Sequence, residues 1–377
     1  MSKFVNSVFL VSGTAIGSGL ISLPISAAKL GMKWTFIIIL LAFLVAYKTS
    51  CLTIDLIKNQ GRALTIVELS SEISGNIAKL ISMTSLYVLS LALLCAYFAG
   101  TSSILSNFFE LSQSLSIVAC IATFGILFLI RSRVFNKLNS GMVFILLALI
   151  IGSVFTMPPS TNGLNNADIS GNFALIIMPF LPIIFTSFGV QNVCPFVAQH
   201  MGLENIKAIK KAFLIGTLIP AIVYALWIYA VLTRIYVFDN ELYVKLLNGG
   251  VEVGELVQSL CNSAHFEFES IILKLLSLFA ILTSAAGTGI GLISSLKETK
   301  LRQNKLLISL IVIGIPAFLT LVVPNAFIRI LSFGGMIATT FVIFMPVYLN
   351  SKISRISVTE LACLIFGSLV VVAEIFM

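Results

Sequence analysis

Long apolar segments alternate with short polar ones along the whole chain of 377 residues. Most of the apolar segments have the length of about 17 to 25 residues that a helix needs to cross a bilayer. The predicted spans are 4–28, 34–57, 81–105, 117–130, 141–157, 173–199, 212–232, 271–294, 306–323, 326–349 and 356–376. The pattern therefore predicts an all-α polytopic membrane protein with about eleven transmembrane helices.

Composition supports lipid as the solvent of this chain. Hydrophobic residues make up 58% and charged residues only 10% of the sequence, whereas soluble domains carry about 25% charged residues. A chain of this length cannot hide so much apolar side chain in its own interior. The composition excludes a soluble enzyme, and the bilayer is the expected surrounding.

Basic residues fall mainly on one side of the predicted membrane. Sixteen of the 23 lysines and arginines lie in alternate loops on the side of the N-terminus. The other side holds six, namely Lys29, Lys33, Arg234, Lys245, Lys274 and Arg329. Because lysine and arginine accumulate in short cytoplasmic loops, the N-terminus is predicted to be cytoplasmic. An odd number of spans then places the C-terminus on the outer side.

The sequence also excludes several other kinds of site. The lysines and arginines are scattered, a few to each loop, so they form no continuous basic surface with stacking aromatic residues that could bind nucleic acid. The six cysteines show no paired spacing, and there are only two histidines. We therefore expect no disulfide framework, no zinc site and no cofactor. The glycines of the first apolar segment, and the ten further spans, favour a retained helix over a cleaved signal peptide.

The first span contains a run that is a poor helix. Gly13, Gly17 and Gly19 fall within the segment 12–24, and each glycine costs about 1 kcal/mol relative to alanine in a helix. Unwound backbone cannot face lipid, so it must line a cavity or be buried in protein. The run is therefore a candidate binding site. The alternative is a small-residue surface for close helix packing.

The sixth span, five spans later, carries a matching interruption. Pro179 and Pro182 precede the run 185–195, which ends at Pro195. Interrupted spans at corresponding positions of two halves indicate an inverted-repeat secondary transporter. We expect a single integral membrane transporter domain over 1–377, with repeats at about 4–157 and 173–349 and an extra helix at about 356–376.

Two broken helices of this kind suit a zwitterion. The outer half of span 1 begins at 17–19 with free backbone N–H groups and the positive end of a helix dipole, which favour a carboxylate. The preceding half-helices end near 13–16 and 185–187. Their carbonyl oxygens suit an ammonium group or a metal cation, so an amino acid satisfies both ends.

The eighth span adds adjacent hydroxyl groups at Thr283 and Ser284. Beside the carbonyls of span 1 they would give a small hard cation oxygen ligands. The alternative is that both hydroxyls bond back to their own helix. Gly287, Gly289 and Gly291 follow without the strand that a dinucleotide fingerprint requires, so they predict a close-packing ridge.

The segment 233–268 is the longest predicted aqueous stretch and is acidic. Its place before span 8 on the outer side suits a lid over an entrance. A solvated loop without a gating role is equally consistent with its charge.

These motifs resemble the tryptophan/tyrosine group of bacterial aromatic amino acid permeases over nearly the whole chain. The resemblance rests on the runs 13–19 with Leu23-Pro24, Phe185-Thr186-Ser187-Phe188-Gly189, Ala96-Tyr97 and Thr283-Ser284. It implies a LeuT-like fold with a 5+5 inverted repeat, broken helices 1 and 6 and one extra C-terminal helix. It also implies import of tyrosine or tryptophan by symport across the bacterial inner membrane, with a periplasmic C-terminus.

The resemblance also implies roles for individual residues. The substrate carboxylate would be held by Gly17, Ser18 and Gly19 with Tyr97 facing it, and the amine by Phe185, Ser187 and Gly189. The coupling ion would meet the carbonyls of Gly13 and Ile16 and the hydroxyls of Thr283 and Ser284. Phe188 and Phe333 are candidates for closing the pocket over an aromatic ring, although phenylalanine is common here and core packing is the alternative.

The coupling ion stays open between proton and sodium. Proton-coupled relatives often place a lysine in the middle of span 5, and 141–157 contains no base. Lys48 and Asp55 lie seven residues apart on one face of span 2 and are candidate proton carriers, because an intramembrane charge is a functional hypothesis by default. The alternative is a Lys48 side chain that reaches toward water.

Other activities remain as alternatives. The same fold could carry another neutral amino acid, such as serine, or an amine. An intramembrane enzyme would need a catalytic constellation, and a channel would need repeated polar faces. We expect a monomer that binds a small amino acid within the lipid bilayer, not an enzyme.

Overall fold

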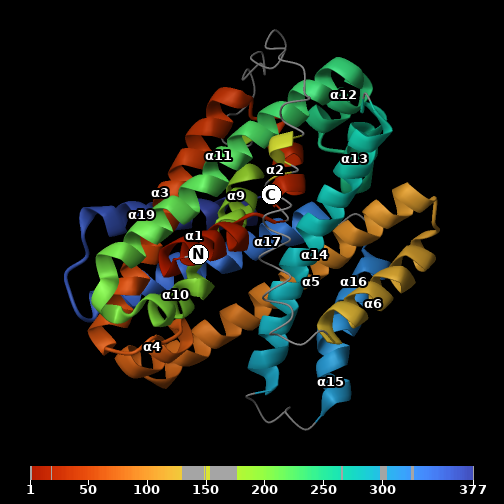
Figure 1. The fold of residues 1–377 in the computed structure, drawn as a ribbon. Coiled ribbons are helices and arrows are strands. Elements are labelled where there is room, and N and C mark those ends of the chain that lie inside the picture. Colours follow the sequence, from red (N-terminus) through yellow and green to blue (C-terminus); the bar gives the residue numbers. More distant parts are fainter. Residues whose placement is uncertain are drawn as a thin grey trace.

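The computed structural model describes residues 2–17, 19–129, 148, 150–152, 176–264, 266–297, 304–323 and 327–376 (Figure 1). All regular structure in these ranges is helical. The predicted fifth span at 141–157 lies almost wholly outside the described residues, and so does Ser18.

The first span is broken, as the glycine run predicts. α1 (Lys3–Ala15) and α2 (Gly19–Ala27) meet at a bend of 50°. Ile16 leaves the helix with a ψ of 112°, and its N–H still donates to Ser12 O. The bend therefore leaves the carbonyl end of α1 and the N–H end of α2 adjacent in the middle of the protein.

The sixth span is interrupted at the predicted place. α9 (Phe180–Ser187) ends at Phe188, and η1 (Gln191–Val193) leads into α10 (Cys194–Met201). Pro195 stands in the first turn of α10, where its missing N–H would have no partner in any case. The chain leaves the helix between 188 and 190, in the interior of this span.

Apart from the fifth, the other predicted spans also have matching helices. Among the described residues, eight helices are long and apolar enough to cross a membrane, the bent pair makes a ninth, and α6 is shorter. Those not yet named are α3 (Met32–Gln60), α5 (Asn76–Phe109), α6 (Gln113–Leu129), α11 (Ile206–Phe238), α14 (Glu267–Lys297) and α19 (Val358–Ile375). Two further spans are each built from several pieces.

Those two spans contain π-helical turns in front of a proline. The ninth comprises α15 (Lys305–Ser309), η4 (Leu310–Gly314) and α16 (Ile315–Val322). The tenth comprises α17 (Phe327–Thr339), η5 (Thr340–Phe344) and α18 (Met345–Ser351). Proline removes a donor from the helical ladder and crowds the preceding turn, so a wider turn before Pro316 and Pro346 is the expected response.

Short helices occupy the longer loops. The segment 233–268, expected to be an aqueous loop, instead extends α11 to Phe238 and then forms α12 (Asn240–Asn248) and α13 (Val253–Asn262). α4 (Ile66–Ser74) starts with a capping box of Thr65 and Glu68, and η2 (Leu203–Asn205) joins α10 to α11. Figure 1 shows α12 and α13 at the end of the molecule opposite α4 and α15.

α11 lies along the broken first span. It packs against α1, α2 and α3 (Figure 1), and Gly216 permits the close approach, since a Cβ there would lie 2.6 Å from Val11 Cβ. On the other side of the breaks, α9 packs against α17, where a Cβ on Gly335 would lie 2.1 Å from Pro182 O. α5 packs against α6, α13, α14 and α17.

Candidate functional site

The two helix breaks meet at Gly19 and Ser187. A Cβ added to Gly19 would lie 2.6 Å from Ser187 Oγ and 2.9 Å from Ser187 Cβ. Both residues are buried, and they begin α2 and end α9 respectively. The N–H end of one half-helix and the carbonyl end of another therefore converge at one point in the interior.

Tyr224 of α11 joins the two breaks. Its hydroxyl donates to Ala15 O at 2.6 Å and lies 3.2 Å from Ser187 O. These are the last residues of α1 and α9. The same hydroxyl would lie 2.8 Å from a Cβ on Gly19, so it fills the space where the three half-helix ends meet.

Trp227, one turn after Tyr224 on α11, binds the start of α2. Its Nε1–H donates to Leu20 O at 2.5 Å in the first turn of α2. Sequence analysis missed Tyr224 and Trp227. Their spacing of three residues places them on one face of a helix, but that spacing alone does not distinguish a site from ordinary packing.

Local turns occupy some of the carbonyls that were predicted to hold an amine. Phe185 O accepts from the N–H of Phe188 at 3.1 Å, and Thr186 O accepts from the N–H of Gly189 at 3.2 Å. Ser187 O instead points toward Tyr224. Of the carbonyls at the end of α9, that of Ser187 is thus the one directed at α11 and the first span.

The first break also touches the eighth span. A Cβ on Gly17 would lie 1.9 Å from Ser284 Oγ and 3.6 Å from Ala280 O. The Ser284 hydroxyl donates to Ala280 O at 3.2 Å, and that of Thr283 to Phe279 O at 2.8 Å. Both hydroxyls therefore bond back to their own helix, while their oxygens can still accept from or ligate a further group. Ile16 is buried beside Gly17.

Aromatic side chains surround Tyr224. The Phe188 ring meets it edge-on, with the centroids 5.6 Å apart, and Tyr97 of α5 interacts electrostatically with it. Phe188 and Tyr97 are both buried. Thr101, one turn after Tyr97, is also buried, and its hydroxyl has no hydrogen-bond partner among the described residues. Two predicted residues thus lie beside the residue that joins the breaks.

Two other predicted aromatic residues lie elsewhere. Phe185 packs its ring 5.9 Å from that of Phe366 on α19, so its side chain faces the extra C-terminal helix. Phe333 is 39% exposed, unlike its buried neighbours Ser332 and Gly334. The structure does not bring the Phe333 side chain into the buried aromatic group around Tyr224.

Lys48 and Asp55 do not pair with each other. The Asp55 carboxylate instead accepts from Lys210 Nζ of α11 at 2.7 Å. Lys48 is exposed on α3, in keeping with the interpretation that its side chain reaches outward. The Lys210 pair links α3 to α11 near the end of the molecule where η2 lies.

At the opposite end, α13 packs on α5 and α14. The N–H of Gly254 donates to Ser103 Oγ at 3.0 Å, and that hydroxyl donates to Glu252 Oε2 at 3.4 Å. Burial, followed by the nearby Glu255 charge, raises the pKa of the Glu252 carboxyl above its ordinary value. A carboxyl thus sits at the contact between α13 and a membrane-spanning helix.

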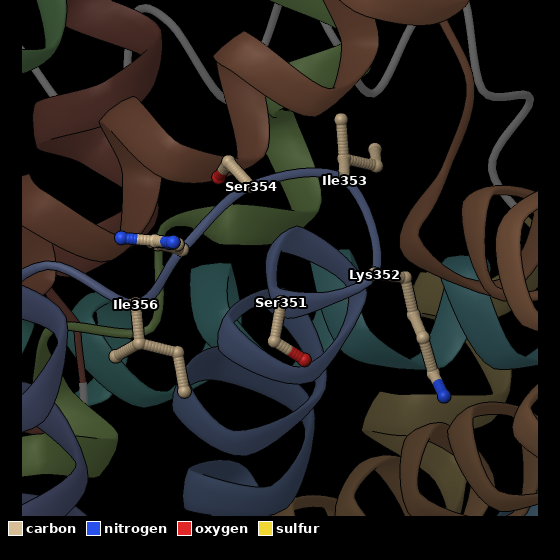
Figure 2. Close-up of a pocket in the computed structure, with 6 residues that line it drawn as sticks. Ser351, Lys352, Ile353, Ser354 and Ile356 are labelled. Carbon is tan, nitrogen blue, oxygen red and sulfur yellow. The ribbon is translucent and has the colours of Figure 1, made fainter.

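A surface hollow of about 550 Å³ lies away from the breaks, at the turn between α18 and α19. Figure 2 shows that the polar side chains of Lys352 and Ser354 point in different directions from this turn. Its polar side chains therefore do not converge on a common point, and the buried breaks remain the candidate site.

Named transporters are similar in sequence to this chain over most of its length. The chain is 26% identical over 94% of its length to the "Tyrosine-specific transport system 1" of Haemophilus influenzae, of which 89% is covered. It is 22% identical over 91% of its length to the "Glutamine transporter 2" of Aliivibrio fischeri, of which 87% is covered.

Among solved structures, the chain resembles a Na⁺-coupled sialic acid symporter in a substrate-bound outward-open state. The TM-score is 0.59 at 13% identity, and the match covers 99% of this chain and 88% of the other. That likeness shows a LeuT-like fold.

The sequence pattern of the tryptophan/tyrosine permease family matches residues 1–376. With two broken spans meeting in a buried polar junction, the chain is an amino acid transporter of the bacterial membrane, and it belongs to the tryptophan/tyrosine permease family.

Proposed function

We propose that this protein imports tyrosine or tryptophan across the bacterial inner membrane by symport with sodium or protons. One observation carries the proposal: the carbonyl ends of α1 and α9 and the N–H end of α2 converge at Ala15, Ser187 and Gly19. Carbonyl ends suit an ammonium group and an N–H end suits a carboxylate, so an amino acid backbone complements the junction.

The aromatic group beside the junction supports an aromatic substrate. Phe188 packs edge-on against Tyr224 in the buried interior, and Tyr97 is buried in the same core. Ring pairs in offset or edge-on arrangements add about 0.5–1.5 kcal/mol beyond the burial of their area. In this proposal Gly17 and Gly19 present N–H groups to the carboxylate, together with Ser18, which lies outside the described residues. Phe333 has no part in it.

The coupling ion is assigned to the contact between the first and eighth spans. Gly17 lies against Ser284, and Thr283 adjoins it. In this proposal the backbone carbonyls of Gly13 and Ile16 and the two hydroxyl oxygens supply the oxygen ligands that a hard cation requires. The named Na⁺ coupling of the sialic acid symporter supports sodium, and the uptake experiment below tests it against protons.

The orientation proposed is a cytoplasmic N-terminus and a periplasmic C-terminus. Bases cluster in the loops around α4 and at the start of α15, which share one end of the molecule (Figure 1). α12 and α13, with Asp239, Glu241, Glu252 and Glu255, lie at the other end. Since cytoplasmic loops hold the bases, the α12–α13 pair would be periplasmic.

A second candidate substrate is another neutral amino acid. The named glutamine transporter among the relatives favours it, because the same half-helix ends hold any α-amino acid and only the side-chain pocket differs. Competition for labelled tyrosine uptake by unlabelled tryptophan, glutamine and serine distinguishes the two candidates. Strong competition by tryptophan alone supports the aromatic assignment, and competition by glutamine with none by tryptophan overturns it.

A further inference from the structure

The Tyr224 hydroxyl faces more acceptors than it can satisfy. A phenol carries one proton to donate, yet this hydroxyl lies 2.6 Å from Ala15 O and 3.2 Å from Ser187 O. The hydroxyl proton is directed mainly at Ala15 O, because that oxygen is the nearer of the two acceptors. Ser187 O is therefore left with an incomplete hydrogen bond in a buried position.

Those two carbonyls also concentrate negative charge. Each belongs to the last residue of a half-helix, where the helix dipole has its negative end and the carbonyls lack intrahelical donors. An ammonium group has three donors and a positive charge. It complements the pair of oxygens better than a neutral phenol with one proton does.

The space around these oxygens is already filled by the hydroxyl. A Cβ on Gly19 would lie 2.8 Å from the Tyr224 oxygen and 2.6 Å from Ser187 Oγ. The Tyr224 side chain is fully buried and is also packed against Phe188. An amine that binds both carbonyls must therefore displace the hydroxyl from them.

We propose that the Tyr224 hydroxyl substitutes for the substrate amine, capping the carbonyls of Ala15 and Ser187 in the empty site and yielding them to the ammonium group on binding. Tyr224 is thus a positioning residue that sets the preference of the transporter for ligands with an amine over ligands without one. The inference rests on the proposed function, because it takes an amino acid as the substrate.

The proposal makes a prediction about discrimination rather than affinity. In the native protein a ligand without an amine leaves the carbonyls capped by Tyr224. In Tyr224→Phe the same ligand leaves the carbonyls without the one hydrogen bond that the phenol supplied, whereas an amino acid still satisfies them. The preference for an amino acid over its des-amino analogue should therefore rise about tenfold, the effect of one unsatisfied buried polar group.

The experiment measures binding of two matched pairs to the purified full chain. The pairs are tryptophan with indole-3-propionate, and tyrosine with 3-(4-hydroxyphenyl)propionate. The ratio of dissociation constants within each pair is compared among the native protein, Tyr224→Phe and Tyr229→Phe. Tyr229 is a matched control because it lies on the same helix but is only partly buried.

A rise in the ratio for Tyr224→Phe but not for Tyr229→Phe supports the proposal. An unchanged or lower ratio in Tyr224→Phe overturns it, since a purely structural tie would weaken both ligands of a pair equally. If the native protein binds neither amino acid, the proposed function itself fails, and this inference fails with it.

A second measurement does not depend on a deleted hydroxyl. With 3-fluorotyrosine placed at position 224, the ¹⁹F resonance should shift on addition of tryptophan and stay in place on addition of indole-3-propionate. Equal shifts with both ligands would overturn the proposal even if Tyr224→Phe proved unstable.

Discussion

The guanidinium of Arg234, near the end of α11, donates a 2.5 Å hydrogen bond to Glu269 Oε1 in the first turn of α14. The side chain of Arg234 is 0% exposed and that of Glu269 is 8% exposed. Arg234 also donates through Nε to Ser263 Oγ and through Nη2 to Ser263 O. One buried cation therefore ties α11, α14 and the end of α13 together.

Removal of this cation should destabilise the protein. Arg234→Ala removes the cation from the buried Glu269 carboxylate, and loss of one member of a buried ion pair typically costs about 3–5 kcal/mol. Thermal melting of the purified protein should show a clear drop in the midpoint of unfolding. The matched control is Lys245→Ala, which removes an exposed contact of 4.0 Å with Glu255 and should change little. Equal midpoints for the two variants would show that the buried Arg234 does not stabilise the fold.

Addition of one methyl group at Gly19 should damage substrate binding. In Gly19→Ala the new Cβ would lie within 3 Å of Ser187 and of the Tyr224 hydroxyl, so the three half-helix ends must move apart. Overpacking of this kind costs about 1–3 kcal/mol, and the KM for uptake should rise about tenfold or more. Gly287→Ala is the control, because no described atom lies within 4 Å of its added Cβ. A normal KM in Gly19→Ala would place the substrate elsewhere.

The hydroxyl of Ser284 should affect the coupling ion. Ser284→Ala removes one oxygen from the contact with Gly17, and the ion concentration that half-saturates uptake should rise about tenfold, as for the loss of one hydrogen-bonding group. Ser277→Ala is the control, since that buried hydroxyl on the same helix donates to Leu273 O within the helix. An unchanged ion dependence in Ser284→Ala would remove the eighth span from the ion site.

Docking of α13 on α5 should depend on pH through Glu252. Burial raises the pKa of this carboxyl in the folded protein, so folding favours its protonated form. The resulting stabilisation is complete below the pKa of the carboxyl in the unfolded chain, which is about 4.5. The contribution is lost as the pH rises through the higher folded pKa. Amide hydrogen exchange in α13, corrected for the intrinsic pH effect, should therefore report weaker protection at neutral pH.

Glu252→Gln should remove that pH dependence, because the amide stays neutral. Glu241→Gln, on the exposed surface of α12, should leave it unchanged. A pH dependence that persists in Glu252→Gln would assign it to another group.

The broken spans could be predicted from the sequence because glycine and proline act locally. Gly17 and Gly19 weaken the helix in which they stand, and Pro195 favours the start of α10. Both breaks lie where the residue pattern puts them. The eighth span was predicted to lie beside the first, and Ser284 lies against Gly17.

Partners supplied by distant segments could not be predicted in this way. Tyr224 lies 209 residues after Ala15, and hydrophobic periodicity shows that a helix face is buried without showing which residue it meets. For the same reason the spacing of Lys48 and Asp55 suggested a common role, while the structure pairs Asp55 with Lys210. Exposure of Phe333 likewise depends on packing between α17 and its neighbours.

Uptake by proteoliposomes tests the central claim most directly. Purified protein should concentrate labelled tyrosine or tryptophan inside vesicles when an inward sodium or proton gradient is imposed. At substrate concentrations below the native KM, Gly19→Ala should strongly reduce this accumulation, whereas Gly287→Ala should not. Accumulation that follows one of the two gradients identifies the coupling ion. Uptake that ignores both gradients, or that survives unchanged in Gly19→Ala, would contradict symport through the junction of the two breaks.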